Sequence, residues 1–557
     1  MDYNKLAELL FPKVECSPDE IEAKFPQRDL PQGAFVTRFA PSPTGSIHFG
    51  NLFAVFTSER LAHQSGGVFY LRIEDTDQKR EVEGAVEVLI DLLANYGINF
   101  DEGALIEGDN GSYGPYRQRS RKDIYHVFAK RLVAEGKAYP CFCSEEELNS
   151  IRERQEEEKA NFGYYGKWAK HRDMPLAEVE RAISEGKAYT VRFRSEGSAD
   201  KKLRFTDLVK GDLEVTENDA DYVLLKSDGI PTYHFAHVVD DHLMKTTHVV
   251  RGDEWLSTLP FHIQLFAALG WKLPKYLHIS PLMIMDGDSK RKLSKRKDPE
   301  ASLTFFREKG YPVAAMREYI LSTLNSNFEE WRSANQDAPA EDFRFSPKKM
   351  SVSGALFDRD KLNDISKNVI SRLTADEVYK LAGEWAYEFD RGFYGLMSED
   401  PDYMKAILNI GRGGKKPRKD ITVWSDLKEY AGFFFEPLFA PDYTYPEGLD
   451  RGGIAQIIRE YGLMFTGEYE DQNGWFDEVK ALSERLGFCP DTKRYKQEPE
   501  RWKGHVGDVS MVIRVAVCGR QQSPDLYEVT RIMGEKMVKN RLKAAAEQLP
   551  YGTDSGV

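Results

Sequence analysis

The residues best suited to chemistry lie in one turn, which reads Arg38-Phe-Ala-Pro-Ser-Pro-Thr-Gly-Ser-Ile-His-Phe-Gly-Asn51. Two prolines and two glycines favour a tight turn, and the apolar spacing beyond it predicts a helix from about residue 52. A short apolar run ahead of the turn predicts a buried strand. The start of a helix, with His48, Gly50 and Asn51 beside it, suits a bound phosphate chain because backbone N–H groups point at the anion there.

A second group suited to phosphate lies in the polar loop 286–298, which contains Lys292-Leu-Ser-Lys-Arg296. Lys292 and Lys295 are flexible point charges that can close over the β- and γ-phosphates of a nucleotide, with Ser294 between them. Taken alone, such a stretch is typical of a solvated charge run. Its occurrence together with the turn at residues 38–51 favours the functional interpretation.

Alternating strand and helix patterns must position these groups. Residues 68–73 form a predicted strand that ends in Arg72-Ile-Glu-Asp-Thr-Asp77, and residues 82–96 form a predicted helix. The alternation resumes with a strand at 248–255 and a helix at 261–269. This order predicts an α/β fold with a parallel, Rossmann-like sheet, and such sheets bind ligands at the carboxyl edge of their strands.

Residues 120–233 interrupt the alternation and predict an α+β insertion. Glu135-Gly-Lys-Ala-Tyr139 is matched by Glu185-Gly-Lys-Ala-Tyr189, which indicates the same helix-ending device used twice. Residues 231–239 read as a strand that Pro231 opens. Beyond residue 302 nearly every segment has helical periodicity, which predicts an all-helical C-terminal region. The predicted domains are a helical extension (1–33), the first half of the parallel-sheet domain (34–119), the insertion (120–233), the second half with the lysine loop (234–345) and a helical region of two bundles (346–557).

The totals set bounds on the class of protein. The chain has 557 residues, 41% hydrophobic and 30% charged, and no apolar run long enough to span a bilayer. A net charge of −13 argues against a general nucleic-acid coat but leaves room for a local basic face. Five scattered cysteines make no disulfide framework, and the acidic N-terminus lacks the features of a signal peptide, so we expect a cytoplasmic protein.

Five motifs in order give the chain a specific resemblance. The first resembles the "His-Ile-Gly-His" signature of class I aminoacyl-tRNA synthetases, and its Ala-Pro-Ser-Pro-Thr-Gly form is similar to that of glutamyl-tRNA synthetases. The fifth resembles the "Lys-Met-Ser-Lys-Ser" loop, with Leu293 in place of Met. The C-terminal stretch 518–529 also looks like the anticodon-binding end of these enzymes. The five motifs lie at residues 41–50, 72–77, 233–242, 250–255 and 292–296.

The resemblance implies an activity and a set of partners. Glutamate and ATP, with Mg²⁺ on the phosphates, would give glutamyl-adenylate and pyrophosphate, and transfer to tRNA(Glu) would follow. The insertion would bind the acceptor end of the tRNA, and the helical C-terminal region would read the anticodon. The family's usual form is a monomer. Whether tRNA(Gln) is also charged stays open.

The resemblance also implies site residues. A substrate with two carboxylates and one ammonium calls for two arginines and one acid, which Arg38, Arg251 and Glu74 supply. The second lysine of the loop, Lys295, is the family's ATP contact. His237 departs from relatives that carry Asn, so its role in the pocket is open. The further glutamate or adenylate contacts carried over are Ala40, Ser42, Tyr233 and His237.

Two groups of residues resemble metal sites, and we expect neither to bind a metal. One set lacks the spacing of a metallohydrolase helix because Pro231 is predicted to open a strand; it comprises His234, His237, Asp240, Asp241, His242 and His248. The other, Cys141 and Cys143 with His171, matches a place where some glutamyl enzymes hold zinc. It lacks a fourth Cys or His ligand, so structural zinc is not expected and two half-buried thiols are the favoured interpretation.

Three other functions compete with this one. Glutaminyl-tRNA synthetases typically carry Pro-Glu-Pro-Asn in place of residues 41–44, and their C-terminal half is a β-barrel. A small-molecule nucleotidylyltransferase could share the first turn and the lysine loop but would not need the helical C-terminal region. A catalytically inactive RNA-binding or scaffold protein is the third. For RNA backbone contact the candidates lie in a basic loop, for which simple solvation is the alternative: Arg412, Lys415, Lys416 and Arg418.

Overall fold

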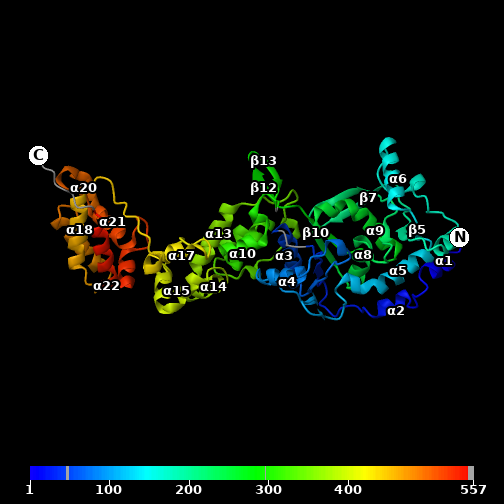
Figure 1. Ribbon diagram of the computed structural model, residues 1–557, viewed down its shortest axis with the longest axis horizontal. Coiled ribbons are helices and arrows are strands. Elements are labelled where there is room, and N and C mark those ends of the chain that lie inside the picture. Colours follow the sequence, from blue (N-terminus) through cyan, green and yellow to red (C-terminus); the bar gives the residue numbers. More distant parts are fainter. Residues whose placement is uncertain (45–48, 295, 415, 550–557) are drawn as a thin grey trace. The chain divides into compact units, whose positions relative to one another are not determined.

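The computed structural model describes residues 1–44, 49–294, 296–414 and 416–549 (Figure 1). The chain divides into two compact units. The first comprises Met1–Phe305 and Arg317–Asp358, and the second comprises Phe306–Met316 and Arg359–Val557. In the part of the chain that the structure describes, no helix combines the length and apolarity needed to cross a membrane.

A parallel sheet forms the centre of the first unit. β1 (Val36–Phe39) pairs in parallel with β2 (Val68–Leu71), which continues to β3 (Glu102–Ala104) and the short β4 (Asp109–Asn110). β10 (His248–Gly252) pairs in parallel with β11 (Lys275–Ile279), and the Thr247 amide donates to the Val36 carbonyl, so β10 lies beside β1. These strands are short apolar runs, as parallel strands covered on both faces require. The predicted α/β fold with a Rossmann-like sheet is confirmed.

Helices cover this sheet and connect its strands. α3 (Phe49–His63) comes after β1 in the chain and is buried along nearly its whole length. The others in this part of the unit are α4 (Ala85–Ala94), α5 (Lys122–Ala134), α8 (Tyr233–Leu243) and α9 (Leu259–Ala268). Two short N-terminal helices, α1 (Tyr3–Leu10) and α2 (Pro18–Ala23), pack against α5 (Figure 1).

The predicted insertion has its own antiparallel sheet. It consists of β5 (Ala138–Cys141), β6 (Thr190–Phe193) and β9 (Val223–Leu225), beside α6 (Glu145–Glu157) and α7 (Leu176–Ser184). A separate hairpin pairs β7 (Lys202–Asp207) with β8 (Gly211–Thr216).

The repeated helix-ending device is confirmed. Gly136 and Gly186 have φ of 71° and 73°, and each is followed by a lysine whose amide bonds back to the helix. A residue without a Cβ is favoured at this left-handed position, which explains why both copies carry glycine.

Two local predictions were wrong. Residues 231–239 do not form a strand, because Phe235, Val238, Val239 and Leu243 are buried at helical spacing and α8 begins directly after Thr232. The polar loop 286–298 is in part a hairpin, in which β12 (Met283–Asp286) pairs with β13 (Ser289–Lys292). Bidentate bonds from Arg291 to Asp298, both 2.7 Å, hold the chain that follows β13.

The second unit is helical, as predicted, and the structure assigns no strand to the residues it describes there. The helices α14 (Ala375–Phe389), α15 (Arg391–Glu399) and α16 (Pro401–Asn409) pack together around one continuous hydrophobic cluster. The same cluster is shared by a second group of packed helices, which comprises α18 (Arg451–Met464), α19 (Gln472–Arg485), α21 (Val506–Cys518) and α22 (Leu526–Glu547). α22 changes direction at Gly534, whose φ is 73°. In chain order, the helices that follow the parallel sheet are α10 (Leu303–Lys309), α11 (Val313–Leu324) and α12 (Phe328–Ala334). The remaining α-helices of the described residues are α13 (Arg359–Arg372), α17 (Asp426–Ala431) and α20 (Thr492–Gln497).

Candidate active site

Arg38 is a buried arginine on β1, only 4% exposed. Its Nε lies 3.3 Å from both carboxylate oxygens of Asp241 on α8, and Nη1 donates to the Val250 carbonyl at 3.3 Å. The guanidinium is therefore oriented from two sides by elements that meet at the carboxyl edge of the sheet. The predicted position of Arg38 at a strand end agrees with this geometry.

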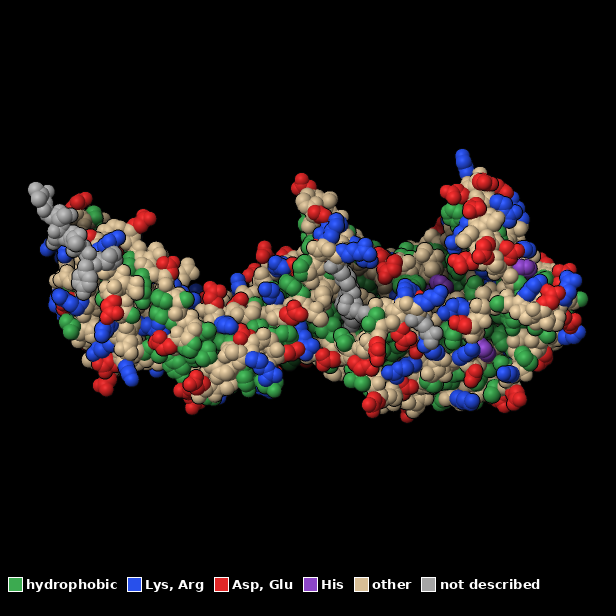
Figure 2. Space-filling model, in the orientation of Figure 1, with side chains coloured by type: hydrophobic (Ala, Val, Ile, Leu, Met, Phe, Trp, Pro, Cys, Tyr) green, Lys and Arg blue, Asp and Glu red, His purple; other side chains and the backbone are tan. Residues whose placement is uncertain are grey.

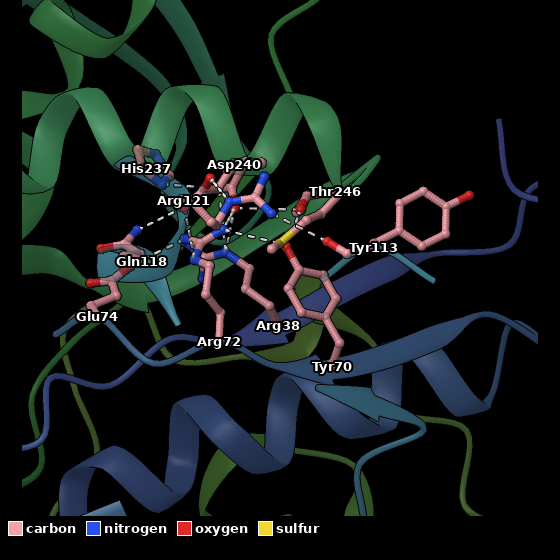
Figure 3. Close-up of polar contacts among 12 residues, drawn as sticks. Arg38, Tyr70, Arg72, Glu74, Tyr113, Gln118, Arg121, His237, Asp240 and Thr246 are labelled. Carbon is pink, nitrogen blue, oxygen red and sulfur yellow. Dashed lines mark hydrogen bonds and ion pairs between the residues drawn. The ribbon is translucent and has the colours of Figure 1, made fainter. Parts of the chain in front are cut away.

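A cluster of buried charges surrounds Arg38, and Figure 3 shows its polar contacts. We call it the buried charge cluster; its members are Arg38, Arg72, Glu74, Arg121, Asp240 and Asp241. Arg72 Nη1 lies 2.6 Å from Asp241, and Arg121 Nε lies 2.7 Å from Asp240. Gln118 and Tyr125 donate further hydrogen bonds to Asp240 at 2.9 and 2.8 Å. Removing any one partner from such a network is destabilising because another charge is then left buried without compensation.

The carboxylates of this cluster differ in their protonation. Burial by itself would raise the pKa of the Asp241 carboxyl, but Arg38 and Arg72 outweigh burial and hold this pKa well below its usual range. At Glu74 the effect of burial outweighs that of the arginines, and the pKa is raised. Burial raises the pKa of the Glu74 carboxyl to about 7, even though Arg72 and Arg38 act to lower it. Glu74 therefore gains or loses its proton near neutral pH.

The turn that joins β1 to α3 is tied to the segment that carries Glu74. The Glu74 amide donates to the Pro41 carbonyl at 2.9 Å, and the Val82 amide donates to the Pro43 carbonyl at 2.9 Å. Ser42 is exposed and Ala40 is partly exposed on the same turn. Arg38, Ala40, Ser42 and Glu74 are thus brought together by backbone hydrogen bonds between the first two motifs.

Arg251, at the end of β10, is oriented by histidines. Its Nε donates to His278 Nε2 at 3.0 Å, and Nη1 lies 3.2 Å from His262 Nδ1. Burial lowers the pKa of both histidines, so the rings are neutral acceptors. No carboxylate among the described residues forms an ion pair with Arg251, in contrast to Arg38.

Asp207 fixes the tautomer of His278. It accepts from His278 Nδ1 at 2.7 Å, which leaves Nε2 as the acceptor for Arg251. Asp207 is the last residue of β7, and the Leu208 amide next to it donates to the Tyr276 carbonyl on β11. The tip of the β7–β8 hairpin is therefore part of the wall behind Arg251.

Tyr233 begins α8 next to these arginines, and His237 lies one turn further along the same helix. The Tyr233 ring is parallel to the His237 ring, with ring centres 5.7 Å apart, and is tilted by 34° against Trp255 at 4.4 Å. Burial raises the pKa of the Tyr233 hydroxyl, and the charges of Glu74, Arg251 and Arg38 also act on it, which places the phenol among the three predicted substrate residues.

His237 is fully buried. Its Nε2 lies 3.1 Å from the Tyr276 hydroxyl, and Nδ1 lies 2.9 Å from Asp241 but outside hydrogen-bond geometry. Burial lowers the pKa of His237 to about 3, so the ring is neutral. It contacts protein groups at both nitrogens, and its role as a substrate contact stays a prediction.

Only some of the residues predicted to bind the nucleotide lie in the part of the chain that the structure describes. Gly50 and Asn51 lie in the first turn of α3, and Gly50 lines a small cleft with Phe53, Ser280 and Gly354. Lys292 is exposed at the end of β13, and the Ser294 amide donates to Asp298 at 2.8 Å. Figure 2 shows basic side chains gathered on the β12–β13 hairpin. His48 and Lys295 lie outside the described residues.

A thiol–imidazole cluster lies in the insertion. Ligand atoms of Cys141, Cys143 and His171 all lie within 4.8 Å of one another. The Tyr164 hydroxyl lies 3.4 Å from the Cys141 sulfur and 3.5 Å from the Cys143 sulfur. The Tyr164 hydroxyl is therefore a polar neighbour of both sulfurs.

The side chains of the other candidate metal set bind other protein groups. Asp240 and Asp241 bind arginines, His234 contacts His262, and His242 contacts Glu22. The argument against this site from a strand at Pro231 was wrong, because these residues lie on or after a helix. The side chains are instead used in the buried charge cluster and its surroundings.

The basic loop after α16 is only partly free to contact RNA. The Arg412 guanidinium donates to the carbonyls of Leu408, Ile370 and Leu373, so it closes the ends of α16 and α13. Lys416 and Arg418 are exposed. Lys415 lies outside the described residues, and RNA contact by this loop stays a prediction.

Sequence reasoning missed the residues that orient the arginines. Asp240 and Asp241 carried a signal, since two acids inside an apolar segment need cationic partners once that segment is a buried helix. Asp207, His262 and His278 carried none. They are scattered over separate segments and meet only through the fold.

Comparisons with known proteins identify the family of the chain. Residues 34–364 match the family model for tRNA synthetases class I (E and Q), catalytic domain, and residues 499–546 match an anticodon binding domain. The chain is 51% identical to a glutamate–tRNA ligase of Acetivibrio thermocellus over 98% of this chain and 100% of that protein. It is 48% identical to one of Clostridium perfringens over 97% and 100%.

Solved structures show the same likeness. A glutamate–tRNA ligase of Elizabethkingia meningosepticum, crystallised in complex with its amino acid, has a TM-score of 0.74 at 26% identity, covering 93% of this chain and 100% of that one. The fold and the matched model define a class I tRNA synthetase of the glutamate and glutamine group. Within that class, the chain belongs to the glutamate–tRNA ligases.

The comparisons confirm the predicted family, activity and helical anticodon-binding region. Glutamate, ATP and tRNA(Glu) are accordingly the substrates. The rival functions, a glutaminyl-tRNA synthetase, a small-molecule nucleotidylyltransferase and an inactive RNA-binding protein, are set aside, because near-full-length relatives at about half identity are glutamate–tRNA ligases.

Proposed function

We propose that glutamate binds between Arg38 and Arg251, with its ammonium on Glu74 and Tyr233 beside it. The observation that carries this proposal is the charge balance. The three arginines of the cluster meet its three carboxylates. Arg251 is a further buried arginine with no ion pair to a carboxylate among the described residues, and its hydrogen bonds go to His278, His262 and the Trp255 carbonyl. An anion with a net charge of −1, which glutamate is at neutral pH, complements that surplus.

The proposed chemistry is in-line attack of the bound α-carboxylate on the α-phosphorus of ATP. The bond to the β-phosphate oxygen breaks, pyrophosphate leaves with Mg²⁺, and glutamyl-adenylate forms. A ribose hydroxyl at the 3′ end of the tRNA then attacks the acyl carbon, loses its proton and releases AMP. Positioning and stabilisation of phosphoryl charge suffice for the first step, and we assign them to His48, Gly50 and Asn51 on one side and Lys292, Ser294 and Lys295 on the other.

The proposal extends to the division of labour along the chain. We assign the acceptor end of the tRNA to residues 120–233 and the anticodon to residues 346–557, which include the matched anticodon-binding segment. We also propose a cytoplasmic monomer, in keeping with five cysteines that form no disulfides. Light scattering of the purified protein tests the oligomeric state.

The test of the site is glutamate-dependent ATP–pyrophosphate exchange, with and without tRNA(Glu). Arg38→Ala and Arg251→Ala should each raise the KM for glutamate by far more than the KM for ATP. Equal effects on both substrates, or none, would contradict the assigned site. Charging assays with purified tRNA(Glu) and tRNA(Gln) then determine whether the second acceptor is used.

A second proposal concerns the insertion. We propose that Cys141, Cys143 and His171 hold a structural Zn²⁺, with the Tyr164 oxygen as fourth donor, in place of the two thiols that the sequence favoured. Support comes from the three convergent ligand atoms, since tetrahedral zinc sites combine thiolate and imidazole ligands. Elemental analysis should find about one zinc per chain, and Cys143→Ser should lose it and lower the melting temperature. The site would be ruled out if the purified wild-type chain contains no zinc and if its melting temperature after chelation equals its melting temperature after zinc is added.

A further inference from the structure

The N-terminal segment, residues 1–33, precedes the matched catalytic model, which starts at residue 34. We propose that Glu22, Phe25 and Arg28 of this segment are positioning residues for the amino-acid site: they hold the end of α8 and Arg121, and through them Arg38. The inference rests on the proposed role of Arg38 in binding glutamate. It gives this segment a part in substrate recognition.

Glu22 fixes the last turn of α8. Its carboxylate lies 3.0 Å from His242 Nε2 and accepts from Trp271 Nε1 at 3.0 Å. The rings of His242 and Trp271 stack at 3.9 Å with an interplanar angle of 4°. His242 directly follows Asp240 and Asp241, so a contact at His242 fixes the backbone that carries both carboxylates.

Arg28 caps the same helix. Its Nε donates at 3.1 Å to the carbonyl of Met244, the C-cap residue of α8, where a carbonyl has no partner within the helix. The other two nitrogens bind Glu102 on β3 at 2.7 and 3.0 Å, and the guanidinium lies 3.8 Å from the centre of the Tyr113 ring. Arg28 thus joins the end of α8 to the parallel sheet.

Phe25 makes a second connection. Its ring is 4% exposed and its centre lies 5.2 Å from Arg121 Cζ. Arg121 in turn binds Asp240 through Nε at 2.7 Å and donates to the Tyr113 carbonyl at 3.3 Å. The Tyr113 hydroxyl returns to the segment, donating to the Pro26 carbonyl at 2.9 Å. Figure 3 shows Arg121 within the buried charge cluster and Tyr113 to one side of it.

Both connections lead to Arg38 through α8, which carries Asp240 and Asp241. Asp240 and Asp241 are adjacent on α8, and Asp241 binds Arg38 and Arg72 at the same time. A shift at the end of α8 would therefore rotate the guanidinium that is to receive the substrate carboxylate. Because misplacement of a bound reactant by about 1 Å can cost about a hundredfold in rate, loss of these contacts should be felt at the glutamate site.

The segment also offers a matched control. Lys5 on α1 forms an ion pair with Glu180 on α7 at 2.6 Å, but both side chains are exposed and neither contacts the cluster. Lys5→Ala removes a contact between the same segment and the rest of the unit without touching α8. A surface pair of this kind contributes little to stability.

The experiment compares Arg28→Ala, Lys5→Ala and Arg38→Ala in the full-length chain by ATP–pyrophosphate exchange with saturating tRNA. We expect Arg28→Ala to raise the KM for glutamate by about tenfold and the KM for ATP by less than about twofold, since only the amino-acid side is displaced. Lys5→Ala should change neither. Arg28→Lys, which keeps a donor for the Met244 carbonyl, should restore part of the loss.

Several outcomes would overturn the inference. If Arg28→Ala lowers only the melting temperature, or raises both KM values equally, the segment stabilises the fold without positioning Arg38. Should Arg28→Ala fail to fold, Phe25→Leu decides in its place by the same split between glutamate and ATP. If Arg38→Ala itself leaves the KM for glutamate unchanged, the proposed glutamate site fails. If Arg38→Ala raises it and the segment variants do not, the inference about the segment alone fails.

Discussion

The protonation of Glu74 leads to a prediction about pH. Burial raises the pKa of its carboxyl to about 7, so the proton is retained below that pH and lost above it. Only the ionised form can bind the ammonium of glutamate. With a pKa of about 7, roughly nine-tenths of Glu74 is ionised at about pH 8 and roughly one-tenth at about pH 6. We therefore expect kcat/KM for glutamate to fall about tenfold over that interval as the pH is lowered.

The assay is ATP–pyrophosphate exchange with glutamate as the varied substrate and tRNA saturating. The same series with ATP varied and glutamate saturating controls for titration of the nucleotide phosphates. His237 and His234 do not interfere, because burial lowers their pKa values to about 3 and about 4. Glu74→Gln should bind glutamate weakly at every pH and lose the dependence.

A flat pH profile of kcat/KM for glutamate would refute the assignment of Glu74 as the group that titrates. A profile that Glu74→Gln retains unchanged would refute it as well. If the fall appears equally with ATP as the varied substrate, the titrating group belongs to the nucleotide side.

Three further variants test other parts of the site. Asp241→Asn leaves two buried arginines without their shared partner and should lower the free energy of unfolding by roughly 3–5 kcal/mol in urea titration; a loss below about 1 kcal/mol would show that the cluster rearranges. His278→Ala removes the acceptor for Arg251 Nε and should raise the KM for glutamate by about tenfold with the KM for ATP unchanged, whereas equal shifts would place His278 outside amino-acid binding. Lys295→Ala should slow adenylate formation by about a hundredfold while tRNA affinity, from filter binding, changes little; small and equal effects on both would contradict its assigned role.

The amino-acid sequence predicted the parts of the fold that depend on short-range patterns. Short apolar runs marked β1, β2 and β10, and glycine after a charged helix end marked the two stops at Gly136 and Gly186. These features depend on neighbours within a few residues, so the local pattern contains the information.

The wrong predictions concern segments whose secondary structure is determined by tertiary contacts. The segment from residue 231 has a proline and apolar residues typical of a strand, but the helix is selected because it buries Phe235 and Val239 while directing Asp241 at two arginines. Strand pairing likewise organises Lys292 into a hairpin that local charge had suggested to be a loop.

The candidate site shows the same division. Arg38 and Arg251 lie at motifs with recognisable local sequence, and each was predicted. The residues that orient these two arginines do not lie in recognisable motifs. Asp207 lies 71 residues from its partner His278, and no periodicity within one segment can indicate such a pair.

The docking of the β7–β8 hairpin tip has a consequence for protein engineering. Because Asp207 belongs to the insertion yet fixes the ring behind Arg251, the insertion is not an exchangeable module. Grafting the corresponding segment from another synthetase, with the aim of changing which tRNA is accepted, would also replace one wall of the proposed amino-acid site. A chimera that keeps its discrimination between amino acids must retain the hairpin tip from the host enzyme and join the foreign sequence beyond it.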